Sequence, residues 1–294
     1  MGTFLGHLLP GSFFILYASW HMFSVFTKYF LSQRALATTR DQGGTGSSGG
    51  GGSPSTPYYR STCAHVFPCC PRIPMEGIVK IVLTTIGFLG ELITAFEDGV
   101  FVHYGNAQHM TMYFAFGLSG VFDIKVSRGP RPALPNLDYV ALAMAFAMEA
   151  LLFGYHLHGR TPLDVQVHML MLYTIMLCAV ATIVEMAYRR SVLPALMRAF
   201  FVMLQGTWFV QIGSILYEPL TSPWDENSHS QMMLATVLFC WHCMGIFLLM
   251  AFVGWLLNSR VKRMLGTSSV YCQLERRLEK GSATCQEALQ LTEE

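Results

Sequence analysis

Long apolar runs separated by short polar stretches divide the chain into seven predicted membrane-spanning helices. A hydrocarbon core of about 30 Å needs roughly 20 helical residues, and each run reaches that length. A soluble helix would alternate polar and apolar faces every 3.6 residues or so, whereas Ala199–Leu204 and Phe247–Leu257 are apolar on all sides. The predicted spans lie near Pro10–Phe30, Gly77–Phe96, Gln108–Val126, Leu137–His156, Val165–Tyr188, Leu193–Tyr217 and Met232–Leu257. The pattern predicts an all-α polytopic membrane protein, a bundle of about seven transmembrane helices.

Positive charges gather in the odd-numbered connections and in the C-terminal tail. Lys125, Arg128 and Arg131 lie at or in the third connection, and Arg189 and Arg190 follow the fifth span. The connections between them are acidic or neutral. Because Lys and Arg favour the cytosolic side of a membrane, the N-terminus is predicted to be outside or lumenal and the C-terminus cytosolic.

The same pattern divides the chain into four parts. Residues 1–31 form the first transmembrane helix, 32–75 a cytosolic connection, 76–258 the other six helices of the same membrane domain, and 259–294 a cytosolic tail. The connection contains the run GGTGSSGGGGSPSTP, whose composition is typical of a flexible coil. Cys69 and Cys70 follow it, and the sequence leaves open whether they are lipidated.

Composition supports a membrane protein and argues against other classes. The chain is 52% hydrophobic and 13% charged, against about 25% charged residues in soluble domains. With a net charge of +1 it has no basic stripe for phosphates, so no nucleic-acid partner is expected and the lipid bilayer is the expected surroundings. No cysteine lies in a predicted outer connection, so no disulfide framework is expected.

Histidines concentrate on the predicted outer side, where Arg160 is the one basic residue out of 19 Lys and Arg. Seven of the ten histidines fall there: His7, His103, His109, His156, His158, His168 and His229. Imidazoles beside carboxylates can bind Zn, Fe, Cu or Mn, and two facing imidazoles can hold haem. A transition metal or haem is therefore a candidate cofactor.

The turn between the fourth and fifth spans concentrates these side chains. Glu149 and His156 are seven residues apart and share one helix face, as do Asp164 and His168, which are four apart. The candidate catalytic residues are Glu149 and Asp164, and the candidate metal ligands are His109, His156, His168 and His242. No H-E-x-x-H signature occurs, so the same residues also fit interfacial histidines and helix-to-helix hydrogen bonds.

Several of these segments resemble the transmembrane protein 45 family. They include Gly6-His7-Leu-Leu-Pro10-Gly11, His109-Met-Thr-Met-Tyr-Phe, His156-Leu-His158-Gly159-Arg160, Gln205-Gly206-Thr-Trp208 and Cys240-Trp241-His242. The resemblance implies a multi-pass protein of about seven spans in endomembranes or at the cell surface, and it implies no established activity. The chain departs from the family pattern Trp-His-His before the third span, where Gln108 precedes a single His109.

Two classes of function follow. The favoured one is a membrane interaction or trafficking component of the secretory pathway, in Golgi or secretory membranes or in the plasma membrane. The alternative is a His/carboxylate metal or haem site at the outer face, serving a hydrolase, an oxidoreductase or a proton-linked transporter. The sequence leaves open whether the chain is an enzyme, which proteins it contacts and whether it forms a homo-oligomer.

Overall fold

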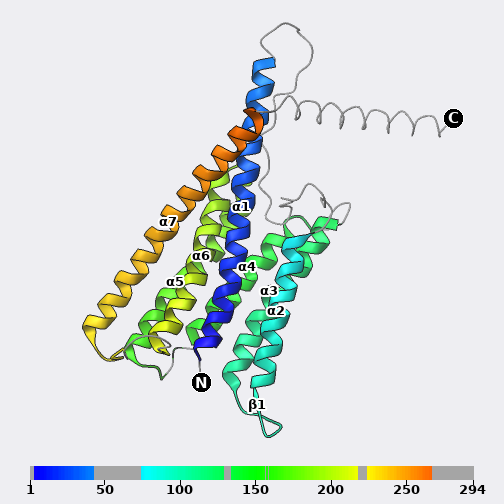
Figure 1. Ribbon diagram of the computed structural model, residues 1–294. Helices are drawn as coiled ribbons and strands as arrows, with labels where there is room; N and C mark the ends of the chain where they lie inside the picture. The colour runs from blue at the N-terminus through cyan, green and yellow to red at the C-terminus, as the bar shows by residue number, and fades with distance from the viewer. Residues whose placement is uncertain are drawn as a thin grey trace, which may run out of the picture.

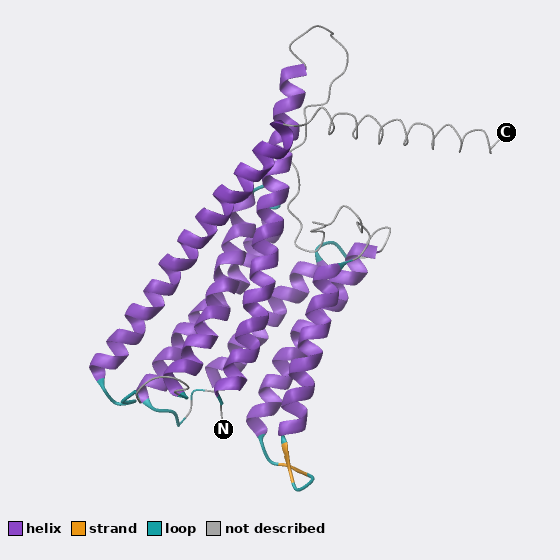
Figure 2. Cartoon of the chain, viewed as in Figure 1, coloured by secondary structure: helices purple, strands orange, loops and turns teal. Residues whose placement is uncertain are grey.

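The computed structural model describes residues 3–42, 74–128, 134–155, 157, 159–217 and 224–266. These residues form a bundle of long helices (Figure 2), which confirms the predicted all-α polytopic architecture. The elements are α1 (Phe4–Gln42), α2 (Met75–Thr94), β1 (Phe96–Glu97), β2 (Val100–Phe101), α3 (Tyr104–Arg128), α4 (Leu137–Tyr155), α5 (Pro162–Ala187), α6 (Val192–Leu216) and α7 (His229–Gly266). The Gly/Ser run, Cys69, Cys70, His156, His158 and the tail after Gly266 lie outside the described residues.

Six of the described helices are long and apolar enough to cross a membrane, and α3 is the exception among the seven. α3 carries Asp123 in its last two turns, and this side chain is only 2% exposed. Its carboxylate lies 2.6 Å from Lys80 Nζ of α2. Pairing offsets much of the cost of burying each charge, which explains how α3 stays packed along α2 inside the bundle.

The helices are arranged as two groups joined by α4. α1 packs along α6, and α5 packs on α6, while α2 packs along α3; α4 contacts both α3 and α5. Consecutive helices run in opposite directions (Figure 1), so the N-terminus, the β1–β2 hairpin and the start of α7 lie at one end. We call this end the histidine end and the opposite one the basic end. Their assignment to the two sides of a membrane stays a prediction.

A short β-hairpin, which the apolar pattern did not predict, connects α2 to α3. Phe96 pairs with Phe101 and Glu97 with Val100. The turn residues Asp98 and Gly99 have φ values of 52° and 80°. An Asp-Gly pair with positive φ at both positions is typical of a two-residue hairpin turn, so the local signal was present in the sequence.

α1 and α6 cross at a pair of glycines. A Cβ placed on Gly206 would lie 2.8 Å from the carbonyl oxygen of Gly11 and 2.8 Å from the backbone nitrogen of Ile15. A Cβ on Gly11 would meet the carbonyl oxygen of Gly206 at 2.9 Å. Small residues allow this close backbone approach between membrane helices, where packing rather than water exclusion drives association. The crossing fixes His7 of α1 next to the last turns of α6.

Gly206→Ala is expected to destabilise the protein by about 1–3 kcal/mol, because the new methyl group meets backbone atoms that cannot rotate away. Gly245→Ala in α7 is the matched control, since a Cβ there meets no atom within 4 Å. Thermal unfolding of the detergent-purified variants, followed by tryptophan fluorescence, measures both. Equal melting temperatures for the two variants would contradict the close crossing.

Candidate functional site

Two imidazoles, one partly buried and one buried, lie next to each other at the histidine end. His7 comes from the first turns of α1 and His168 from the second turn of α5, and their ring centroids are 6.0 Å apart with an interplanar angle of 75°. His168 is only 2% exposed. The sequence separation of the two residues is large, so the pair depends on the α1–α6–α5 packing.

Each ring is held through its Nδ1 atom. His168 Nδ1 lies 2.7 Å from Asp164 Oδ1 and 2.9 Å from the Asp164 carbonyl oxygen. His7 Nδ1 lies 3.0 Å from the carbonyl oxygen of Thr3. A carbonyl oxygen or a carboxylate only accepts, so the Nδ1 atoms are the donors and the lone pair of each neutral ring is on Nε2.

Asp164 is itself held in place. Arg160 Nη1 donates to both carboxylate oxygens of Asp164, at 3.0 and 2.8 Å. Arg160 lies just before α5, and Asp164 lies in the first turn of that helix. Pro162 at the first helical turn and Gly159 with φ of 78° shape this segment, because proline suits a helix start and glycine tolerates positive φ. The result is a relay in which Arg160 orients Asp164 and Asp164 orients His168.

Aromatic side chains enclose the pair. Phe153 lies 5.8 Å from the His168 ring, and Tyr217 and Phe209 lie 5.3 and 6.4 Å from the His7 ring, measured between centroids. Burial raises the pKa of Tyr217, which follows the end of α6, and nearby Arg160 opposes that shift. Tyr217 is therefore a neutral hydroxyl near neutral pH.

A third histidine has the same kind of anchor. His109 Nδ1 of α3 lies 3.1 Å from Glu91 Oε1 in the last turn of α2. His109 is also within electrostatic range of His7. Three imidazoles at this end thus each have Nδ1 next to an oxygen, although they come from three different helices.

The other predicted residues have partners deeper in the bundle. Gln205 Nε2 donates to both carboxylate oxygens of Glu149 at 2.9 Å, and the Cys178 thiol donates to Gln205 Oε1 at 3.3 Å. His242 Nε2 lies 3.4 Å from Gln211 Oε1. Glu149 and His242 thus make side-chain contacts with amides of α6.

The predicted outer hairpin brings Asp164 and His168 together as expected, and His156 lies outside the described residues. Within the described ranges no group of three or more His, Cys, Asp or Glu side chains has a metal-binding arrangement. His7, which the sequence placed among the outer histidines but not among the candidate ligands, turns out to be the neighbour of His168. Its position next to α5 follows from the Gly11–Gly206 crossing, which spacing along the chain does not reveal.

A second polar network lies at the basic end. Arg198 of α6 is fully buried, and its Nε donates to Glu185 Oε2 of α5 at 2.5 Å. Its Nη2 lies 2.8 Å from His21 Nε2 of α1, and Tyr139 of α4 donates to Glu185 Oε1 at 3.0 Å. Four helices therefore meet around one ion pair. The i, i+4 spacing favours Arg189 as the partner of Glu185, but Arg189 instead stacks over the Tyr139 ring.

The helices, their apolarity and their packing define an integral multi-pass membrane protein of the all-α class. Residues 135–254, which span α4 to most of α7, match a family described as a family of unknown function (DUF716). This match covers Asp164, His168 and His242, whereas His7 and His109 precede it.

Along most of its length the chain is similar to curated membrane proteins. It is 23% identical over 254 residues to transmembrane epididymal protein 1A of Mus musculus, covering 83% of this chain and 77% of that protein. It is 24% identical over 255 residues to transmembrane epididymal protein 1 of Rattus norvegicus, with the same coverage of 83% and 77%. The human transmembrane epididymal protein 1 is 24% identical over 200 residues, or 64% of this chain and 71% of that protein. The resemblance to the transmembrane protein 45 family stays a prediction beside these matches.

Proposed function

We propose that this membrane protein binds a transition-metal ion at its histidine end, through the Nε2 atoms of His7 and His168. The observation that carries the proposal is the pair of neighbouring rings, with centroids 6.0 Å apart, each with its Nδ1 hydrogen-bonded to an oxygen. Two imidazoles on one tetrahedral ion have ring centroids roughly 5 Å apart, so a small shift brings both to ligating distance. Metal-binding histidines generally donate their second nitrogen to a carboxylate or carbonyl oxygen in this way.

The chemistry that suits this arrangement is activation of water for hydrolysis. Two protein imidazoles leave coordination positions open, and a metal ion lowers the pKa of water bound in such a position. Asp164 supports the ligand His168 through Nδ1, and Arg160 keeps Asp164 ionised and oriented. His109, with Glu91 beside its Nδ1, is a further imidazole at this end with the same kind of hydrogen bond, and His156 remains a predicted ligand.

The test is metal content and affinity of the full chain purified in detergent. Elemental analysis is expected to find a transition metal near one equivalent, and an ultraviolet–visible spectrum separates a metal ion from haem. After chelation, titration with Co²⁺ should produce a d–d absorption spectrum typical of nitrogen ligation. His7→Ala and His168→Ala are each expected to abolish this spectrum, and Asp164→Asn to weaken binding by roughly 10–100-fold.

The matched control is His103→Ala. His103 is also at the histidine end and also contacts a carboxylate, with Nε2 2.9 Å from Glu97 Oε1, but the contact is made through Nε2 and the Glu97 side chain is 68% exposed. This variant should retain wild-type Co²⁺ binding. Binding that survives loss of both His7 and His168 would overturn the proposal, as would a wild-type protein that binds no metal.

If the purified protein binds no metal, the interaction or trafficking role predicted from the sequence is the remaining class of function. In α2 and in α7, only 17% of the most apolar 18-residue stretch of the helix is buried inside the protein, against 61% in α6. Both helices therefore leave most of their surface to lipid or to other membrane helices.

A further inference from the structure

A groove lies on the outer surface of α7, and it is separate from the pair His7 and His168. It has a volume of about 570 Å³ and lies along the first turns of α7, with Gln166 contributed by α5. Gln166 and His168 are two residues apart, so they point to opposite sides of α5, and the groove does not open onto His168. The inference below does not depend on the proposed metal site.

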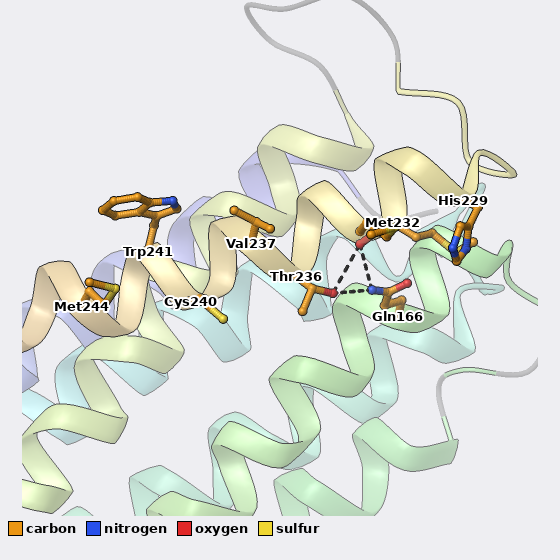
Figure 3. A pocket seen from close by; sticks show the side chains of 9 residues that line it. Gln166, His229, Met232, Thr236, Val237, Cys240, Trp241 and Met244 are labelled. Atoms are coloured by element: carbon orange, nitrogen blue, oxygen red, sulfur yellow. Dashed lines mark hydrogen bonds between the residues drawn. The ribbon is translucent and has the colours of Figure 1, made fainter.

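The groove has one polar end. Figure 3 shows Gln166 reaching α7, where its Nε2 donates to the Met232 carbonyl oxygen at 2.9 Å and to Thr236 Oγ1 at 2.7 Å. Both amide hydrogens are used, which leaves the Gln166 carbonyl oxygen as an acceptor. His229 at the start of α7 adds a second hydrogen-bonding side chain at this end.

The rest of the groove is apolar and adaptable. Val237, Trp241 and Met244 recur at helical spacing on one face of α7, and all three are largely exposed at 49, 64 and 55%. Methionine side chains fit irregular apolar surfaces because they are unbranched and flexible. None of the lining residues is Asp, Glu, Lys or Arg, so the lining carries no permanent charge to pair with a charged headgroup.

The length of the groove favours a lipid chain over a partner helix. Its lining on α7 runs from His229 to Met244, roughly 20 Å at the rise of an α-helix. One leaflet of a bilayer is about 15 Å deep, whereas a partner helix would follow α7 through about 30 Å of hydrocarbon. The groove starts with hydrogen-bonding groups at one end of the bundle and continues as apolar surface for about one leaflet.

We propose that this groove binds the acyl chain of one lipid with an uncharged, hydrogen-bonding headgroup. The headgroup hydroxyl or amide donates to the Gln166 carbonyl oxygen, and the chain lies along Val237, Trp241 and Met244. This assigns to the protein a lipid site distinct from ordinary bilayer contact.

The experiment uses the full chain in phosphatidylcholine vesicles with a diazirine-labelled monoacylglycerol as probe. After irradiation, mass spectrometry should locate the label mainly within residues 229–244. Val237→Trp fills the groove and should reduce that labelling several-fold, while Leu248→Trp, at an exposed α7 position outside the groove, should not. A fatty acid with the same diazirine chain tests the headgroup and is expected to label the groove less.

Three results would overturn the proposal. Labelling spread evenly over the exposed faces of α2 and α7 means ordinary bilayer lipid only. Equal labelling in Val237→Trp and wild type means that the groove is not the binding surface, provided that both melt at the same temperature. Efficient cross-linking of two chains through Cys240, a groove thiol, means that a second copy of the protein covers the groove instead.

Discussion

Arg198→Leu is expected to destabilise the protein by about 3–5 kcal/mol, the usual effect of removing one partner from a buried ion pair. Arg198 is fully buried, and it contacts Glu185 through Nε and His21 through Nη2. Its loss leaves the Glu185 carboxylate inside the bundle, where the Tyr139 hydroxyl also donates to it. Unfolding of the purified protein by increasing SDS in mixed micelles measures the change in free energy.

The double variant Arg198→Leu with Glu185→Leu separates charge from packing. Replacing both members of a buried pair by apolar residues is often neutral or stabilising, so this variant should recover most of the stability lost in Arg198→Leu. Arg260→Ala is the matched control, because Arg260 is an exposed arginine near the basic end of α7. A double variant as unstable as the single one would mean that side-chain shape, rather than charge, holds the four helices.

Hydropathy was sufficient to predict six of the seven described helices as spans, with α3 the exception, because the bilayer sets both the length and the composition of a span. The prediction was less accurate for the ends of the helices and for the turns between them, which depend on individual residues. α1 begins at Phe4 and continues to Gln42, beyond both ends of the predicted span, because neither Pro10 nor the polar residues after Phe30 end the helix. The Asp98–Gly99 hairpin was missed because its two strands are only two residues each.

Some contacts of the candidate site could be predicted from the sequence, and others could not. Asp164 and His168 are one helical turn apart, so their contact could be predicted from spacing. The contacts of His168 with His7 and of Arg198 with Glu185 depend on which helices are neighbours. The choice of neighbours depends on small residues at helix crossings, such as Gly11 and Gly206. Arg198 and Lys80 lie near span ends, where basic residues usually indicate topology, so the sequence pattern alone did not predict their buried ion pairs.

Lys80→Met is expected to destabilise the protein by about 3–5 kcal/mol for the same physical reason at a different interface. Lys80 Nζ lies 2.6 Å from Asp123 Oδ2, and the two residues are 8% and 2% exposed. The ammonium also lies 5.3 Å from the centre of the Tyr17 ring of α1. One side chain of α2 therefore holds α3 by an ion pair and contacts α1 by a cation–π interaction.

A double-mutant cycle with Asp123→Leu measures the coupling between Lys80 and Asp123 directly. If the ion pair dominates, Asp123→Leu and Lys80→Met should each be much less stable than the double variant, because each alone leaves one uncompensated charge in the bundle. Tyr17→Leu removes the contact with α1, together with the hydroxyl that accepts from Arg198 Nη1 at 3.5 Å, and should cost about 0.5–2 kcal/mol through the lost cation–π contact, in addition to lost packing. Additive effects of Lys80→Met and Asp123→Leu would contradict the ion pair. In that case the close packing of the two helices would be the main contact between α2 and α3. At this contact a Cβ on Gly77 would meet the Gly120 carbonyl oxygen at 2.7 Å.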